Sequence, residues 1–190
     1  MNAISKYGSP LMSNDFYLLT NKNPYAKGDG WYLPERKEKV QGIVIHCADH
    51  YPADELANFW SKTKRPTSIH YVVDDKNIIP MLPPEYIAFH TEGHDNISIG
   101  VDIAYYSDQW GSNPEIEQKI LKNLGFLIAK LQKNFKLPNR KCTHTEWNNG
   151  LKGIIGNAEL RPTIYKDPGI NFDWVNLIRL IKDFKSQESI

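Results

Sequence analysis

The sequence predicts a single α/β domain in which a mixed central β-sheet is flanked by helices. Two observations support this: short apolar, β-branched runs alternate with amphipathic stretches, and no repeat, low-complexity tract or interior linker divides the chain. With 190 residues the chain is long enough for one domain with a hydrophobic core. We place this domain at residues 39–190. Residues 1–38 are polar and show no helical or strand periodicity of apolar residues, so we interpret them as an irregular N-terminal arm.

Four segments have the pattern of strands. GIVIH, residues 42–46, is a buried run that ends in a histidine, and residues 68–82 predict two strands around a turn at 74–77. Residues 96–106 are apolar on both faces, which favours a central position in the sheet. RKCTHT, residues 140–145, predicts a further short strand, followed by a Gly- and Asn-rich loop.

Helical periodicity appears in three segments. Residues 53–63 carry apolar side chains at helical spacing, and residues 173–184 predict a final helix. The strongest pattern is residues 114–135, whose isoleucines and leucines fall on one face. A proline opens this segment, and either Ser112 or Asn113 is suited to cap it.

The composition excludes several classes of partner. A formal net charge of +1 is too small to attract nucleic acid or an acidic membrane surface electrostatically. No apolar run approaches the ~20 residues of a membrane span. The N-terminus lacks the basic and apolar regions of a secretory signal, so we expect a chain that is cytoplasmic at synthesis. Two cysteines are too few for a disulfide framework. We expect the chain to be a monomer.

Among six histidines, two stand where an α/β sheet builds its sites. His46 and His144 each end a predicted strand, and Asp167 lies in an Asp-Pro-Gly turn. A lone histidine at a strand end is more often structural, and Asp167 on its own is equally suited to form the turn. Together the three make a good ligand set for zinc, which in catalytic sites keeps a fourth position for water.

The ordered segments IVIHC, SIHYVVDDKNIIPMLPPEYIAFHTEGHDNISIGVDI, CTHTEW and YKDPG resemble the zinc-dependent N-acetylmuramoyl-L-alanine amidases of type 2. This family shares its fold with the peptidoglycan recognition proteins and the phage lysozyme-amidases. The resemblance spans roughly residues 40 to 184, and it implies that His46, His144 and Asp167 bind Zn²⁺.

The resemblance also implies roles in the substrate cleft. His90 lines the cleft, and Asn96 supports the central strand beside it. Asp102 stands where some members carry a glutamate that acts as acid and base. Other members use a tyrosine at the position of Ile69; since residues 69 and 71 of one strand share a face, Tyr71 is the alternative.

Near the third predicted ligand the chain departs from the family pattern. The family usually carries Lys or Thr two residues before this ligand, whereas this chain has Tyr165 there and Lys166 one position later. Either is suited to donate to an oxyanion. Trp147, close after His144, is predicted either to stack on a sugar ring or peptide stem or to pack in the core.

These assignments predict a peptidoglycan hydrolase that cleaves the amide bond between N-acetylmuramic acid and L-alanine. Zinc activates a water, and Asp102 moves its proton to the leaving nitrogen. Alternatives are a non-catalytic peptidoglycan-binding module and a cytosolic amidase that recycles anhydromuropeptides. An unrelated zinc peptidase is disfavoured because the sequence has no H-E-x-x-H motif. The favoured setting is a phage endolysin that reaches the wall after holin-dependent release.

Overall fold

The computed structural model describes residues 32–33, 36–62 and 65–187, so most of the predicted N-terminal arm lies outside the described residues. The strands are β1 (Tyr32–Leu33), β2 (Gly42–Cys47), β3 (Tyr71–Val73), β4 (Ile78–Pro80), β5 (Ile87–Ala88), β6 (Ser98–Ile103) and β7 (Gly153–Gly156). The helices are α2 (Ala53–Lys62), the 3-10 helix η1 (Asp95–Ile97), α3 (Pro114–Phe135), α4 (His144–Asn148), α5 (Asn157–Leu160) and α6 (Trp174–Gln187).

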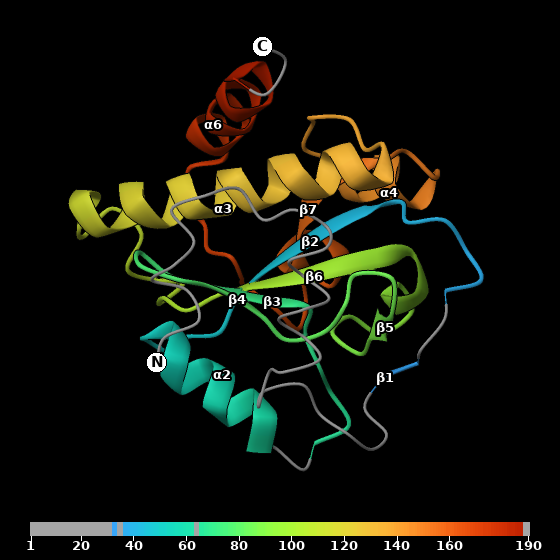
Figure 1. The fold of residues 1–190 in the computed structure, drawn as a ribbon, viewed down its shortest axis with the longest axis horizontal. Helices are drawn as coiled ribbons and strands as arrows, with labels where there is room; N and C mark the ends of the chain where they lie inside the picture. Colours follow the sequence, from blue (N-terminus) through green and yellow to red (C-terminus); the bar gives the residue numbers. More distant parts are fainter. Residues whose placement is uncertain (1–31, 34–35, 63–64, 188–190) are drawn as a thin grey trace.

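Five strands form the central sheet, in the order β4-β3-β6-β2-β7. β2 runs parallel to both β6 and β7, and β3 runs parallel to β6 but antiparallel to β4, so the sheet is mixed. Helix α2 covers one face, and α3 and α6 lie over the other (Figure 1). The predicted mixed sheet flanked by helices is confirmed, and β6 lies at its centre as its apolar faces predict.

The main core fills the space between the sheet and helices α3 and α6. Ile43 and Ile45 of β2 and Ile120, Leu124 and Ile128 of α3 are wholly buried there. α3 has the predicted bounds. It begins with Pro114 at its first position, and the Asn113 side chain accepts a hydrogen bond from the Ile116 N–H at 3.3 Å.

Two sequence predictions about the region after α3 are wrong. Residues 140–145 form no strand; Lys141 makes an isolated bridge to Ile154, and His144 begins α4. Thr143 and Glu146 form a capping box, which satisfies the first backbone N–H groups of this helix. The predicted Gly- and Asn-rich loop contains β7, an edge strand only four residues long between glycines.

The last residues of the predicted arm contact the domain. The Arg36 guanidinium donates to the carbonyl oxygens of Asp95, Asn96 and Ser98, and so holds this segment against η1 and the start of β6. No helix in the described part of the chain is long and apolar enough to cross a membrane.

Candidate active site at the strand ends

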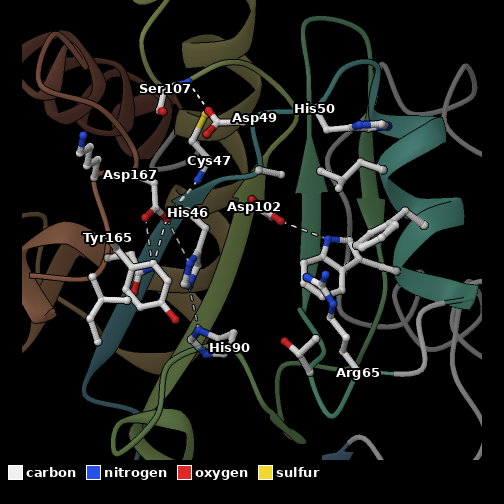
Figure 2. A pocket seen from close by; sticks show the side chains of 18 residues that line it. His46, Cys47, Asp49, His50, Arg65, His90, Asp102, Ser107, Tyr165 and Asp167 are labelled. Carbon is white, nitrogen blue, oxygen red and sulfur yellow. Dashed lines mark hydrogen bonds and ion pairs between the residues drawn. The ribbon is translucent and has the colours of Figure 1, made fainter.

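A pocket of about 670 Å³ opens where the carboxyl ends of β2, β6 and β7 meet. Polar side chains gather there because the ends of parallel strands lie at one edge of the sheet. Figure 2 shows His46, Asp167 and Tyr165 on one wall, with His50 and Arg65 on the other. Phe59 and Trp60 of α2 also line the pocket, which gives it an aromatic side.

The strand register brings three polar residues side by side. His46 of β2 pairs with Asp102 of β6. Ile45 pairs with Gly156, the last residue of β7, so Asn157 follows beside His46 on the other side. His46, Asp102 and Asn157 all line the pocket, and all three are buried.

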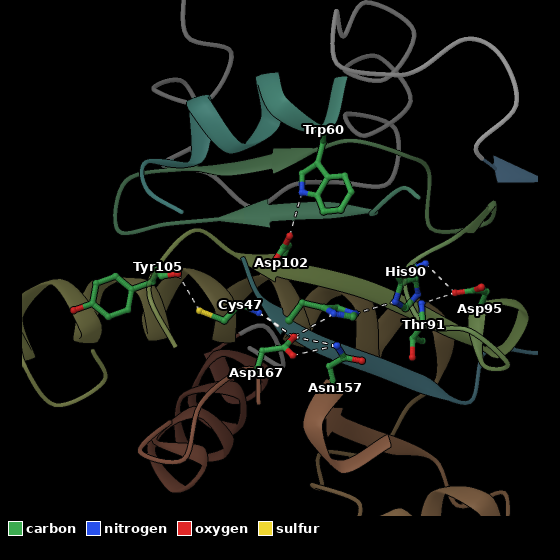
Figure 3. Close-up of polar contacts among 10 residues, drawn as sticks. Cys47, Trp60, His90, Thr91, Asp95, Asp102, Tyr105, Asn157 and Asp167 are labelled. Atoms are coloured by element: carbon green, nitrogen blue, oxygen red, sulfur yellow. Dashed lines mark hydrogen bonds and ion pairs between the residues drawn. The ribbon is translucent and has the colours of Figure 1, made fainter. Parts of the chain in front are cut away.

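Asp167 reaches the same place from the turn after α5. Its Oδ2 lies 3.4 Å from His46 Nδ1 and accepts a hydrogen bond from the Cys47 N–H at 3.3 Å. The Asn157 Nδ2 donates to both carboxylate oxygens, at 3.1 and 3.2 Å (Figure 3). Asp167 is therefore more than a turn residue, since its side chain joins the strand-end group.

The turn that carries Asp167 is fixed by packing. The Trp110 Nε1–H donates to the Pro168 carbonyl at 2.8 Å, and the Ala158 N–H donates to the Asp167 carbonyl at 2.8 Å. Gly169 has φ 122°, and a Cβ at this position would lie 2.1 Å from the Ser107 carbonyl oxygen. Only glycine is accommodated at position 169, which fixes the end of the turn that carries Asp167.

A chain of hydrogen bonds fixes the proton positions on the two histidines of the pocket. Ser98 Oγ donates to the His94 carbonyl at 2.7 Å, so His90 Nε2 must donate to Ser98 Oγ, at 3.2 Å. His90 Nδ1 then accepts from His46 Nε2, 3.0 Å away. Desolvation lowers the pKa of His90 well below its ordinary value, in keeping with a neutral ring. Nε2 of His46 therefore carries a hydrogen, and its Nδ1 faces Asp167.

Asp102 is a buried carboxyl with one free oxygen. The Trp60 Nε1–H donates to Oδ2 at 3.1 Å, whereas Oδ1 has no hydrogen-bond partner among the described residues (Figure 3). Burial raises the pKa of Asp102 to about 7, and the Asp167 charge acts in the same direction. A carboxyl with this pKa can both accept and return a proton near neutral pH.

Tyr165 and Lys166 line the pocket directly before Asp167. Both are exposed, and the Arg161 guanidinium lies 6.0 Å from the centre of the Tyr165 ring. They therefore stand at the rim of the pocket, within the segment predicted to hold the oxyanion donor.

The structure does not bring His144 to His46 and Asp167, which corrects the predicted grouping. As the first residue of α4 it is exposed; its Nδ1 donates to the Glu159 carbonyl at 2.7 Å, and its Nε2 accepts from Asn148 Nδ2 at 2.7 Å. The described residues contain no group of three or more His, Cys, Asp or Glu side chains that could hold a metal ion. His46 and Asp167 are left as a pair.

Tyr71 and Trp147 also lie away from the pocket. β3 begins at Tyr71, whose side chain packs in the core beneath α3, whereas Ile69 packs with α2 on the opposite face. The premise that residues 69 and 71 share a face is therefore wrong. Trp147 is 1% exposed and packs against Val44, so the core alternative describes its position and leaves no ring face for a sugar.

Asn96 lies in η1, directly before β6, and its side-chain amide donates to Glu38 Oε1. It does not line the pocket, whereas His90 does. Sequence reasoning missed Asn157. The signal for it was the apolar run GIIG directly before it, which marks a strand and places its next residue at the strand end.

Comparison with known proteins gives consistent matches. A family model described as N-acetylmuramoyl-L-alanine amidase matches residues 36–169. The N-acetylmuramoyl-L-alanine amidase CwlA of Bacillus subtilis (strain 168) is 29% identical over 127 residues, which cover 59% of this chain and 46% of CwlA. The chain thus spans about half the length of this curated relative.

Several solved structures share the fold. The Staphylococcus aureus hydrolase AmiA, in complex with its ligand, aligns with a TM-score of 0.66 at 17% identity, covering 98% of this chain and 97% of AmiA. A mutant endolysin from Bacillus subtilis aligns with a TM-score of 0.59 at 18% identity, covering 82% of this chain and 94% of that one.

Proposed function

Because the chain belongs to the N-acetylmuramoyl-L-alanine amidase family, we propose that it hydrolyses the amide bond between N-acetylmuramic acid and L-alanine in peptidoglycan or its fragments. The observation that carries the proposal is the pocket at the strand ends, where the His46–Asp167 pair and the buried Asp102 carboxyl face one cavity. Two further proposals complete it: residues 39–190 form the catalytic domain, and the chain acts as a monomer.

A divalent cation fits the His46–Asp167 pair. His46 Nδ1 and Asp167 Oδ2 lie 3.4 Å apart beside the pocket, and imidazole and carboxylate are both ordinary ligands of zinc, on which the family generally depends. When bound, such a cation polarises a carbonyl and lowers the pKa of water. His90 holds the ring of His46 in the required tautomer.

Asp102 is the proposed acid and base. Trp60 donates to one of its oxygens and the other has no hydrogen-bond partner among the described residues, so we propose that the carboxyl takes a proton from the attacking water and returns it to the L-alanine nitrogen. Tyr165 and Lys166 at the rim are the proposed donors to the oxyanion. Tyr71, beneath α3, has no part in this proposal.

The test is the release of stem peptides from purified peptidoglycan sacculi, with new L-alanine amino termini measured by mass spectrometry in the presence of Zn²⁺ or Mn²⁺. Asp102→Asn keeps the side-chain shape but removes the base, and we expect a rate about 10²- to 10⁴-fold lower. Asp54→Asn, an exposed carboxyl in α2, is the matched control and retains full activity. Sacculi that yield no new L-alanine termini with either cation contradict the proposal.

A second candidate is a peptidoglycan-binding module without catalysis. The observation that favours it is the absence of His144 from the pocket, and the described residues contain no group of three His, Cys, Asp or Glu side chains that could hold a metal ion. This candidate predicts that the chain sediments with sacculi but releases no stem peptide.

For the biological setting we propose a phage endolysin that acts on the bacterial wall after holin-dependent release. The fold shared with a Bacillus subtilis endolysin supports this setting. A cytosolic recycling amidase would instead prefer soluble anhydromuropeptides to intact sacculi. Comparing the rates on these two substrates separates the settings.

A further inference from the structure

We propose that Trp110 is a positioning residue of the candidate active site. Its indole N–H holds the turn at Pro168 and so sets where the Asp167 carboxylate lies in the pocket. Trp110 does not itself line that pocket, so it acts through the turn and not by touching a substrate. Its effect on catalysis rests on the proposed function, whereas its effect on the turn does not.

The segment that carries Asp167 depends on few anchors. The chain runs over the surface on both sides of the turn, since the two residues before Asp167 are exposed and Ile170 after it is 98% exposed. Pro168 is buried between them. The backbone is held by the Ala158 N–H, which donates to the Asp167 carbonyl, and by Trp110, which donates to the Pro168 carbonyl at 2.8 Å. Removing the indole donor takes the partner from a buried carbonyl, so we expect the turn to move.

Trp110 is held rigidly by its neighbours. Its side chain is 3% exposed, and its ring centre lies 5.1 Å from that of Tyr105 and 4.8 Å from that of Phe172, in edge-to-face arrangements. A donor packed on two sides cannot follow a displaced acceptor, as an exposed side chain can. The position of the indole N–H therefore determines the position of the turn.

A buried carboxylate on α3 fixes the loop that carries Trp110. Glu117 is 9% exposed, and its Oε1 accepts hydrogen bonds from the backbone N–H groups of Gly111 and Asn113, both at 2.9 Å. It also accepts from the Tyr105 hydroxyl at 3.3 Å. These partners lie on both sides of Trp110 in the sequence, so the loop is tied to a helix of 22 residues. Glu117 thereby has a role, although the proposed chemistry does not use it.

The same loop joins Asp102 and Asp167, the two carboxylates of the pocket. It begins directly after β6, the strand of Asp102. It then reaches the turn, where a Cβ at Gly169 would lie only 2.1 Å from the Ser107 carbonyl oxygen. One residue earlier, the turn accepts the Trp110 N–H. The loop therefore sets the distance between the two carboxylates, and a displacement of about 1 Å can lower the rate of an enzyme about 10²-fold.

The test uses two substitutions that separate the ring of Trp110 from its N–H. Trp110→Phe keeps a packed ring but has no donor. Trp110→Gln loses the ring but keeps a donor, because Nε2 of glutamine is as many bonds from Cβ as the indole Nε1. We expect Trp110→Phe to lower kcat for stem-peptide release about 10- to 100-fold, with KM changed less than twofold. Trp110→Gln should unfold at lower urea concentration than Trp110→Phe and yet have the higher kcat.

This crossing distinguishes positioning from support of the fold, for which activity would follow stability. If Trp110→Gln does not fold, the isostere β-(3-benzothienyl)alanine is placed at position 110. It keeps the shape of the indole and replaces the N–H with sulfur, so kcat should fall as in Trp110→Phe while the urea midpoint stays closer to that of the wild type. Tyr105→Phe is the matched control: it removes one hydrogen bond, that to Glu117, from the same ring stack, and kcat should stay within twofold.

Amide hydrogen exchange, followed by NMR without substrate, reports on the turn directly. The N–H groups of Ala158 and Phe172 donate to the carbonyls of Asp167 and Gly169, so both exchange faster when the turn opens. In Trp110→Phe we expect about 10-fold faster exchange at these two amides, measured relative to the amides of β6. Tyr105→Phe should show no such difference.

Unchanged exchange at Ala158 and Phe172 in Trp110→Phe overturns the proposal, whatever the activity. A kcat that follows the urea midpoint across the variants overturns it as well. A wild-type chain that releases no stem peptide contradicts the proposed function instead, and the exchange measurement then still decides whether Trp110 holds the turn.

Discussion

The two faces of the central sheet are built from the same strands but differ in character. In β2, Ile45 points into the core beneath α3, and the next residue, His46, points into the pocket. In β6, Val101 and Asp102 divide in the same way. Successive side chains of a strand alternate between faces, so the carboxyl ends of these strands supply core residues to one side and pocket residues to the other. Changes on the two faces should therefore separate stability from activity.

The sharpest test of this separation is Asp167→Asn. The amide keeps the shape and still accepts the Cys47 N–H, but it removes the charge beside His46. We expect stem-peptide release to fall at least about 100-fold, since even groups outside the metal's own ligands are worth ~10- to 100-fold in metal affinity or activity. The free energy of unfolding in urea should fall by only about 0.5–1.5 kcal/mol, because Asn157 Nδ2 loses one of its two acceptors. Asp183→Asn, an exposed carboxyl on α6, is the matched control; equal activity of the two variants would break the comparison.

The opposite face should show the reverse pattern. Leu124 of α3 is wholly buried, and Leu124→Ala removes about 2–5 kcal/mol from the free energy of unfolding by leaving a cavity. Activity per folded molecule should stay unchanged, measured below the melting temperature. Val175→Ala, at a position that is 83% exposed on α6, should cost under about 0.5 kcal/mol. A large loss of specific activity in Leu124→Ala would show that the faces are coupled.

A fully buried histidine, His70, should contribute to the acid sensitivity of the fold. His70 is buried; its Nδ1 accepts from the Gly100 N–H, and its Nε2 lies 3.1 Å from the Tyr86 carbonyl oxygen and 3.0 Å from Arg36 Nη2. Burial, with the nearby Arg36 charge, lowers the pKa of His70 to about 3 from 6.5. Between these values the unfolded chain binds the extra proton, so stability present above pH 6.5 is lost as the pH falls toward 3.

This contribution is measurable as a slope. His70→Gln retains one acceptor and one donor but does not titrate. In urea unfolding between pH 6.5 and 4, the wild type should lose up to about 1.4 kcal/mol per pH unit more than this variant. Parallel stability curves for the two proteins would contradict the neutral, buried state of His70.

The sequence predicts the apolar face better than the polar one, and the reason is physical. Helix α3 and strand β6 are predicted from the pattern of apolar residues, which can be read from consecutive positions in the sequence. The capping box at Thr143 and Glu146 marks the start of a helix, yet the residues CTHT also have the pattern of a strand. Because we follow the strand pattern, His144 is predicted at a strand end, whereas it begins α4.

The composition of the pocket depends on contacts between distant segments. Asn157 enters it because β7 pairs with β2 more than a hundred residues earlier in the chain, a register that no short pattern encodes. His46, Asp102 and Asp167 were placed by motif order and do line the pocket. Trp147 and Tyr71 have the same residue types as groove-lining groups, and only tertiary packing shows that both are core residues.

The smallest change in stability should come from removing the N-terminal cap of α3, a helix that packs on the face of the sheet opposite the pocket. The Asn113 side chain satisfies the Ile116 N–H, and Asn113→Ala should cost about 1 kcal/mol in urea unfolding. Asn113→Ser restores an oxygen at the same place and should recover most of that loss, which a general effect of surface substitution would not do. Neither variant should change the rate of stem-peptide release, because α3 touches the apolar face of the sheet and its cap lines neither wall of the pocket. If the rate of stem-peptide release fell together with this small loss of stability, the two faces of the sheet would be coupled. The geometry of the pocket would then depend on the stability of the whole domain and not only on the ends of its strands.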